Sequence, residues 1–184
     1  MTTEKIIIIG PEVTSRMAVA KKISELDDSY VVAPTFTSDL SMQDKITDDF
    51  VYYLSLDDIQ LAFKNNAFMF VNSSGDDTVG ITYADMCTSD LFVLSFEDFN
   101  NVSTRMLDEI RPVICWIDTK KKSYDAYKKD LTEAKYVIEK IDSREITTLY
   151  FNEDVDDVDS IANTMLTYMT GDEVIRAEIL EENS

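Results

Sequence analysis

Four consecutive isoleucines, Ile6–Ile9, stand near the start of the chain and are followed by Gly10-Pro11. A run this apolar predicts a strand that is buried on both faces. Apolar residues then recur at helical spacing over Val13–Leu26, and two more apolar blocks, at 91–96 and 113–117, are expected to be central strands. Strand-like blocks that alternate with helix-like stripes predict an α/β domain.

Turn residues and capping patterns indicate the remaining elements. Ser55 with Asp58 and Thr82 with Asp85 are typical of helix N-termini. The turn at 73–77 predicts a hairpin of strands 68–72 and 78–81. Further strands are expected at 30–33, 50–54 and 147–151, and residues 34–49 are expected to be irregular. Helices are expected between 96 and 112 and at 124–141, and a last long helix is expected to be preceded and opened by the acidic residues of 154–159. The tail after Gly171 is expected to pair as an edge strand over 174–180 or to remain loose.

The chain length and the distribution of apolar residues limit the class of protein. With 184 residues, 45% of them hydrophobic, the chain can bury one sizeable core and is expected to form one domain. No apolar run approaches the ~20 residues that a membrane-spanning helix needs. The first ten residues lack the basic region of a signal peptide. We therefore expect a soluble cytoplasmic protein.

The chain contains no histidine, which excludes several kinds of chemistry. Ser-His-Asp and Cys-His catalysis, histidine acid–base catalysis and histidine-ligated metals all require that side chain. The two cysteines, Cys87 and Cys115, cannot build a four-cysteine zinc site or a disulfide framework. Cys115 lies in an apolar block and is expected to be a buried thiol. No metal site is predicted.

The charge is strongly unbalanced, with 36 acidic and 17 basic residues and a formal net charge of −19. Such a surface repels the phosphates of nucleic acids and of anionic membranes, so neither is expected as a partner. The simplest interpretation of the acidity is that it keeps the protein soluble. The alternative is that the chain imitates the charge of a nucleic acid and so occupies the binding site of a nucleic-acid-binding protein.

The turn after the isoleucine strand is where a phosphate-binding loop would lie. That loop requires Gly, four residues, Gly-Lys and then Ser or Thr. Here the first glycine is Gly10, but Ser15 replaces the second glycine and Arg16 replaces the lysine. Met17 replaces the hydroxyl that binds Mg²⁺, and Glu12 places a negative charge within the loop.

The order of the motifs resembles that of guanylate kinase over roughly residues 5–170. The matching segments are Lys5–Pro11, Tyr52–Ser55 leading into Asp57-Asp58-Ile59, Ala67–Phe70, Gly80–Thr82 and Leu149–Asp154. The resemblance implies a parallel-sheet P-loop kinase-like core flanked by helices, over about residues 1–33 and 90–170. It also implies a small inserted monophosphate-type lobe (about 34–89), a lid-like segment (about 118–130) and an acidic tail (171–184).

The same resemblance implies candidate site residues. A vestigial nucleotide site would comprise Gly10, Pro11, Ser15, Arg16 and Asn152, and substrate contacts would come from Glu97, Tyr53 and Thr82. The family's monophosphate-binding arginines have no counterpart, because no arginine occurs between Arg16 and Arg105. Phe70 stands where the family has a guanine-reading Glu, and Val79 stands where it has a phosphate-binding Tyr. The family's lid arginines have no clear counterpart, and the cations nearest to those positions in the sequence are Lys120–Lys122.

The leading hypothesis is therefore a guanylate-kinase-like pseudoenzyme that acts as a protein-binding or regulatory module, with no cofactor. Such losses would suit a divergent viral or phage protein. One alternative is an active (deoxy)nucleoside monophosphate kinase that uses ATP and Mg²⁺, with Arg16 in place of the P-loop lysine. The other is the acidic inhibitor that mimics nucleic acid.

Overall fold

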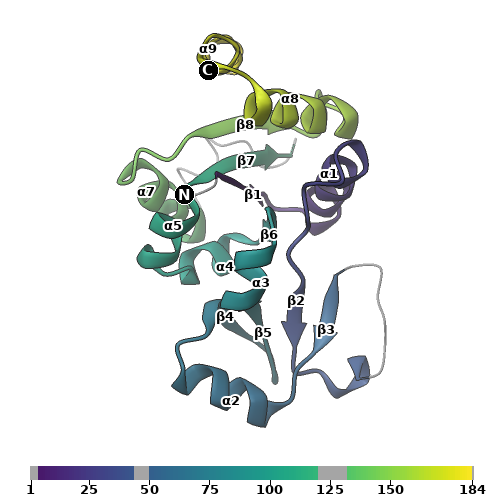
Figure 1. Cartoon of the computed structure of the whole chain (residues 1–184), viewed down its shortest axis with the longest axis vertical. Coiled ribbons are helices and arrows are strands. Elements are labelled where there is room, and N and C mark those ends of the chain that lie inside the picture. The colour runs from purple at the N-terminus through teal and green to yellow at the C-terminus, as the bar shows by residue number, and fades with distance from the viewer. Residues whose placement is uncertain (1–3, 44–49, 120–131, 184) are drawn as a thin grey trace.

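The computed structural model describes residues 4–43, 50–119 and 132–183 and contains two sheets (Figure 1). The larger sheet has the strand order β6-β1-β7-β8, and every pairing in it is parallel. Its strands are β1 (Lys5–Ile9), β6 (Leu91–Leu94), β7 (Pro112–Asp118) and β8 (Thr148–Asn152). The α/β fold predicted from the apolar pattern is confirmed.

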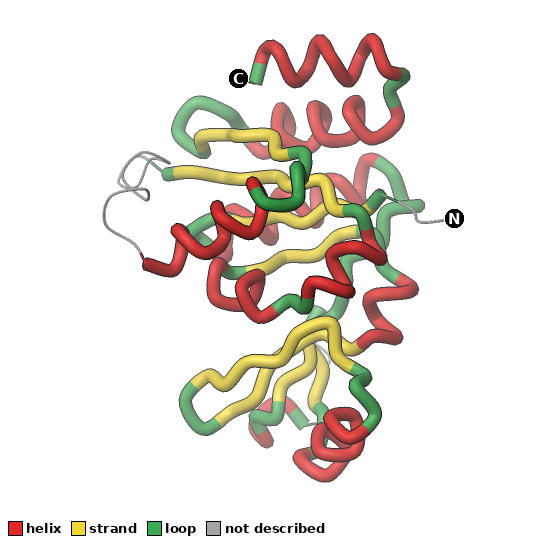
Figure 2. Tube along the Cα trace, turned by 90° about the vertical axis from the view of Figure 1, so that its left-hand side faces the viewer, coloured by secondary structure: helices red, strands yellow, loops and turns green. Residues whose placement is uncertain are grey.

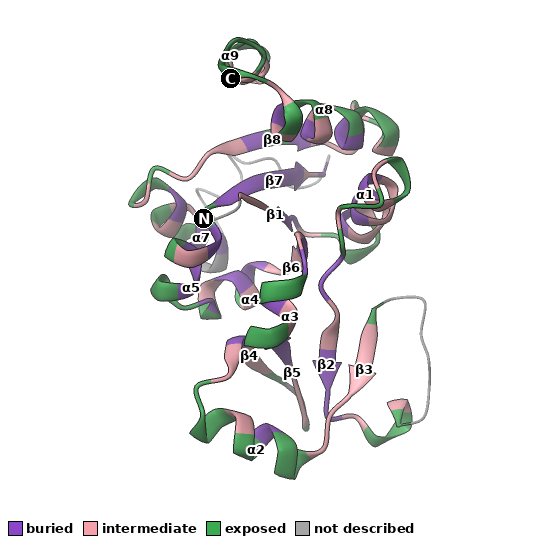
Figure 3. Ribbon diagram, viewed as in Figure 1, coloured by how far each residue is buried: buried purple, intermediate pink, exposed green. Residues whose placement is uncertain are grey.

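The isoleucine strand β1 lies inside this sheet and is covered on both faces. Ile6 and Ile8 pack with residues of helices α1 (Val13–Leu26) and α8 (Val158–Thr170). Ile7 and Ile9 point to the other face, where they share a cluster with Trp116 and with helices α4 (Phe96–Asn101), α5 (Thr104–Ile110) and α7 (Thr132–Asp142). Figure 2 shows these helix layers on either side of the strands, and Figure 3 shows β7 buried along most of its length.

The second sheet belongs to a separate layer, which we call the lobe and define as the described residues from 35 to 88. Its strand order is β3-β2-β5-β4, with β2 parallel to β3 and antiparallel to β5. The lobe contains β2 (Thr35–Thr37), the 3-10 turn η1 (Leu40–Met42), β3 (Val51–Tyr53), α2 (Leu56–Lys64), β4 (Phe68–Ser74), β5 (Asp77–Thr82) and α3 (Tyr83–Thr88). It lies below the parallel sheet in Figure 1.

Local capping signals identify helix starts correctly. The Ser55 hydroxyl accepts a hydrogen bond from the Asp58 N–H, and the Thr82 hydroxyl accepts one from the Asp85 N–H. Asp157 caps α8 in the same way. The hairpin is also confirmed, because β4 and β5 pair across a turn in which Gly75 adopts a positive φ of 65°.

Two predicted elements are wrong. Residues 30–33 form no strand, since Val32 makes only an isolated bridge to Leu91, and the strand lies instead at Thr35–Thr37 within the segment expected to be irregular. The tail after Gly171 is a helix, α9 (Glu173–Glu182), because the Asp172 carboxylate caps the N–H groups of Val174 and Ile175.

The region between β6 and β7 differs in detail from the single helix that was expected. It contains two helices, α4 and α5, with Ser103 capping the second, and α5 ends at Arg111 before Pro112. The helix expected at 124–141 is confirmed from residue 132, and its first part lies outside the described residues. The lid-like segment lies outside them from residue 120, as do Lys120–Lys122, and the domain boundaries stay predictions.

Candidate functional site

The turn from β1 to α1 lies at the carboxyl edge of the parallel sheet. Gly10 is packed so closely that a Cβ atom there would lie 2.4 Å from the Ile117 carbonyl oxygen on β7. Only Pro11 and Glu12 follow before α1 begins at Val13. Glu12 is the N-cap residue, with extended backbone, and its carboxylate makes no capping hydrogen bond. Gly10 therefore has a packing role that is independent of any ligand.

The helix start decides what this turn can bind. In a phosphate-binding loop, the residues between the two glycine positions curl so that their N–H groups surround a phosphate. In this chain Val13, Thr14 and Ser15 already belong to α1. Ser15 Oγ donates a hydrogen bond to Glu153 Oε2, which holds a second carboxylate beside the turn. The turn has the geometry of a helix start rather than of a phosphate-binding loop.

Arg16 lines a cavity of 560 Å³ between α1 and the lobe. Its side chain is only 6% exposed, and its Nε donates to the Glu12 carbonyl oxygen at 3.3 Å. Burial lowers the pKa of Arg16, while the neighbouring carboxylates of Asp98 and Glu12 oppose this shift. Because arginine stays protonated in proteins, Arg16 supplies a buried positive charge. The other lining residues are Val13, Thr14, Met17, Ala18, Lys21, Thr35, Val51, Val93, Ser95 and Asp98.

Asp98 is the carboxylate that the structure places in this cavity. Its Oδ2 accepts a hydrogen bond from the Ser95 N–H at 3.1 Å, and the Ser95 hydroxyl accepts one from the Asp98 N–H at 3.1 Å, which together form a capping box at the start of α4. The Ser95 hydroxyl also donates to Asp98 Oδ2 at 2.7 Å. Asn72 on β4 donates to its other oxygen at 3.5 Å. The predicted substrate residue Glu97, one position earlier, is exposed and is not among the cavity-lining residues. The Ser95/Asp98 pair matches the helix-start pattern and could have identified Asp98.

The other predicted substrate residues lie elsewhere in the lobe. Tyr53 lines a separate groove of 500 Å³ with Leu40, Leu56 and Asp57. Thr82 caps α3, and its hydroxyl donates to Asp85 at 2.6 Å. The structure does not bring Tyr53, Thr82 and Glu97 together with Arg16.

Tyr52, the neighbour of Tyr53, shares the carboxylate that Thr82 contacts. Its hydroxyl donates to Asp85 Oδ2 at 2.8 Å, and burial, followed by this hydrogen bond, raises the pKa of Tyr52 above its usual value. The side chains of Tyr52, Thr82 and Asp85 thus join β3 to the start of α3.

Asn152 and the residues after it border the other side of the first turn of α1. The Asn152 N–H donates to Asp156 Oδ2 at 2.8 Å, and the Asn152 side-chain oxygen accepts from the Asp154 N–H at 3.0 Å. These bonds shape the turn between β8 and α8. A cavity of 410 Å³ here is lined by Ser15 and by four carboxylates, those of Glu153, Asp154, Asp156 and Asp157. This second cavity is unfavourable for a polyphosphate because of charge repulsion.

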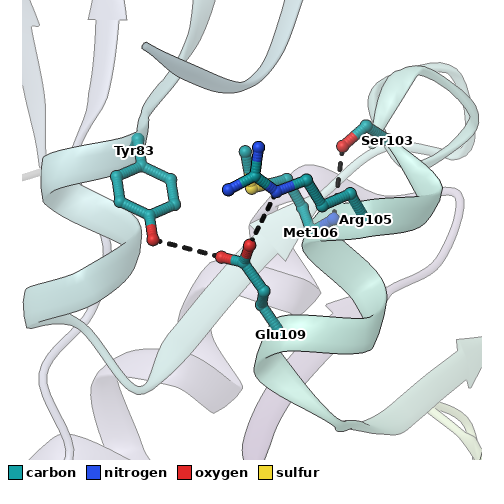
Figure 4. Close-up of polar contacts among 5 residues, drawn as sticks. All are labelled: Tyr83, Ser103, Arg105, Met106 and Glu109. Carbon is teal, nitrogen blue, oxygen red and sulfur yellow. Dashed lines mark hydrogen bonds and ion pairs between the residues drawn. The ribbon is translucent and has the colours of Figure 1, made fainter. Parts of the chain in front are cut away.

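A polar cluster connects the lobe to the helices of the parallel-sheet layer (Figure 4). The Tyr83 hydroxyl on α3 donates to Glu109 Oε2 at 3.1 Å, and Arg105 Nε donates to Glu109 Oε1 at 2.8 Å. The hydrogen bond from Arg105 is the main cause that lowers the pKa of Glu109. Ser103 begins the same helix by accepting from the Met106 N–H. This cluster and the Asn72–Asp98 contact are two side-chain connections between lobe and core.

The residues present do not fit a magnesium-bound triphosphate. Met17 offers a thioether where a hard oxygen ligand is needed, and the helical start leaves no phosphate-wrapping loop. Among residues 4–43, 50–119 and 132–183, no group of three or more acidic or cysteine side chains is arranged to hold a metal ion. In the same ranges, no helix is long and apolar enough to cross a bilayer.

Comparison with known proteins agrees with the fold. No protein-family model and no curated protein matches the sequence. Among solved structures, the guanylate kinase from Anaplasma phagocytophilum matches with a TM-score of 0.54 and 14% sequence identity, over 96% of this chain and 86% of that one. At this identity the similarity establishes the architecture alone, and the chain has the α/β fold seen in that guanylate kinase.

Proposed function

We propose that this protein is a binding module with the fold of a guanylate kinase that does not transfer phosphoryl groups. The observation that carries the proposal is the early start of α1 at Val13, which leaves only Pro11 and Glu12 between Gly10 and the helix. Phosphoryl transfer depends almost entirely on positioning and on neutralising phosphate charge. A turn that cannot wrap a phosphate removes the first requirement.

The electrostatics of the turn support the same proposal. The free N–H groups of the first turn of α1 would attract an anion. However, the exposed Glu12 stands at the N-cap, and Ser15 holds Glu153 close by. Two carboxylates at a helix start repel a triphosphate at short range. Binding of ATP there is expected to be weak and independent of Mg²⁺.

The cavity between α1 and the lobe supports it as well. Within the described residues, Arg16 is the only arginine that lines this cavity, and Lys21 is the only other cation. Asp98 offsets part of that positive charge. Loss of an arginine that stabilises the transition state costs about 10³–10⁵ in rate. A cavity with one buried arginine beside a carboxylate is therefore poorly suited to phosphoryl transfer.

The surface of the lobe supports binding to another protein. Leu40, Leu56, Leu61 and Phe63 are all more than half exposed, and Leu40 and Leu56 line one groove together with Tyr53. Exposed apolar groups that gather in one place are typical of interaction sites. Asp39, Asp57, Asp76 and Asp77 also line this groove, so a partner with basic and apolar side chains would complement it.

The enzymatic alternative is tested by incubating the protein with ATP, Mg²⁺ and each nucleoside monophosphate while diphosphate formation is followed. We expect no turnover. Turnover that the substitution Arg16→Ala abolishes and Lys22→Ala leaves intact would refute the proposal and establish a kinase. Lys22 is a suitable control because it lies on the same helix and pairs with Asp159 rather than lining the cavity.

Nucleotide binding is tested separately by thermal unfolding. ATP with Mg²⁺ at about 1 mM is expected to raise Tm by no more than about 1 °C. The variant Glu12→Ser/Val13→Gly/Ser15→Gly/Arg16→Lys/Met17→Ser restores the phosphate-loop pattern and should increase that shift if the backbone regains the loop. A large Mg²⁺-dependent shift in the natural protein would contradict the proposal.

Partner binding is tested with variants of the groove. Proteins captured by the wild type should be lost with Leu40→Ser/Leu56→Ser and retained with Val174→Ser, which alters an equally exposed apolar residue on α9. Capture that depends on both leucines and survives high salt supports an apolar interface. If only nucleic-acid-binding proteins are captured and salt releases them, charge mimicry is the better explanation.

A further inference from the structure

A polar cavity of 350 Å³ lies at the edge of the parallel sheet opposite to the β1–α1 turn. It is located where the strands begin, beside Pro112 at the start of β7 and Thr147 just before β8. Two arginines from distant parts of the sequence, Arg111 and Arg144, line it together. None of its lining residues also lines the cavity that contains Arg16.

Each arginine is positioned by a helix end. Arg111 is the C-cap of α5, has a left-handed backbone (φ 44°, ψ 71°) and donates its N–H to the Leu107 carbonyl oxygen at 3.2 Å. Arg144 follows α7, and its N–H donates to the Ile141 carbonyl oxygen at 3.1 Å. A left-handed backbone at a residue other than glycine is held in place by its surroundings. The backbone therefore brings both side chains to the same cavity.

Arg144 has a buried donor with no acceptor. Its Nη1 donates to the Ser143 hydroxyl at 3.4 Å, but its Nε is buried, and no described residue accepts a hydrogen bond from it. A buried, unsatisfied N–H costs about 1–3 kcal/mol and calls for an explanation, such as a bound ion. Arg144 therefore has hydrogen-bonding capacity that no described residue uses.

Three carboxylates, those of Glu4, Asp108 and Glu145, line the cavity beside the two arginines. Glu4 is engaged by Arg176 Nη1 at 2.9 Å. Asp108 and Glu145 also line the cavity, but within the described residues neither forms an ion pair with Arg111 or Arg144. The charge of Arg144 acts on Lys140, whose pKa is lowered to about 8 by burial and, to a lesser extent, by Arg144.

We propose that this cavity is a binding site for a small oxoanion, either a phosphate or a carboxylate group, held by the guanidinium groups of Arg111 and Arg144. Both anions match the planar fork of a guanidinium, which can donate two parallel hydrogen bonds to their oxygens. Arg144 contributes a guanidinium group whose Nε has no acceptor among the described residues. The overall charge of −19 opposes anion binding, so the affinity is modest.

The test is an NMR titration of the whole protein at constant ionic strength, with inorganic phosphate in one series and acetate in the other. The Arg144 Nε–H signal and the amides of residues 145–147 should shift and saturate, with a Kd of roughly 1 mM for the preferred anion. The series with the lower Kd identifies the phosphate or carboxylate preference. If water alone satisfies Nε, neither series moves that signal up to about 20 mM, and the proposal is wrong.

Matched variants assign the binding to the cavity. Arg144→Gln and Arg111→Gln should each weaken binding by about tenfold or more, because each removes a charged donor. Arg105→Gln removes the same charge from an exposed ion pair on α5 and should leave the Kd unchanged. If all three variants have the same effect, binding is diffuse and the proposal fails. Arg111 is exposed, so its variant should fold even if Arg144→Gln does not. This inference does not depend on the proposed function, and failure of either leaves the other intact.

Discussion

The substitution Gly10→Ala separates a packing role of this glycine from a ligand-binding role. The added Cβ would lie 2.4 Å from the Ile117 carbonyl oxygen and 3.3 Å from its carbonyl carbon. An ordinary contact needs roughly 1 Å more, and backbone atoms on both sides leave no flexible group to move away. The β1 and β7 strands must therefore separate locally.

The magnitude follows from the cost of overpacking. Inserting a methyl group into a tightly packed region costs about 1–3 kcal/mol, and a backbone contact puts this position near the upper end. Alanine also restricts the unfolded chain, which returns about 0.4–1 kcal/mol. We expect a net loss of about 2 kcal/mol and a fall in Tm of about 4–8 °C for a chain of this length.

Urea unfolding followed by the fluorescence of Trp116 measures this loss directly. Trp116 is the only tryptophan and is fully buried on β7, next to the perturbed contact. Gly75→Asn is the control, because a Cβ at Gly75 meets no atom within 4 Å and asparagine tolerates its positive φ. If Gly10→Ala is as stable as wild type to within about 0.5 kcal/mol, the close approach of β1 and β7 is not real and the packing argument fails.

Three further predictions test neighbouring features. Asp98→Ala removes the capping box and should lower the free energy of unfolding, measured in urea, by about 1–2 kcal/mol. Glu97→Ala, at the exposed neighbouring position, should change it by no more than about 0.5 kcal/mol, and equal losses would contradict the placement of Asp98. A thiol reagent should modify Cys87 in the native protein and reach Cys115 only after unfolding, because Cys115 is fully buried and burial raises the pKa of its thiol. Fast reaction of both thiols in the native protein would contradict this prediction. The pKa of Lys140 is lowered to about 8 in the folded state, so the unfolded chain binds more protons than the folded chain between about pH 8 and 10.4. The stability of the wild type relative to Lys140→Met should therefore rise with pH in this window. A fall would show that the ammonium is favoured by its three backbone carbonyl acceptors.

The sequence alone was sufficient wherever the information is local. The continuous run Ile6–Ile9 identifies a strand covered on both faces, because no half-exposed strand would place apolar side chains on both sides. Ser55 and Thr82 identify helix starts because a cap requires only residues three positions apart. The departures from the phosphate-loop pattern at Ser15 and Met17 are likewise visible in the sequence.

Nonlocal pairing explains the elements that the sequence missed. The strand Thr35–Thr37 contains too few apolar residues to indicate a strand and is specified by its partners in β3 and β5. The final helix α9 has a local start signal in Asp172, but its apolar stripe is weak, and Ile179 and Leu180 bury part of their surface against the core cluster. Such contacts depend on residues far away in the sequence, so a local pattern cannot reveal them.

For the candidate site, the sequence determined which chemical groups are present, and the tertiary structure decided which of them meet. Arg16 was identifiable from its position after Gly10, but its burial beside Asp98, rather than Glu97, depends on how α4 is rotated as it packs under the sheet. Likewise, nothing in the sequence links Arg111 to Arg144, which are 33 positions apart. They share a cavity because β7 and β8 are parallel neighbours, and parallel pairing places both strand starts, with the residues that precede them, at one edge of the sheet.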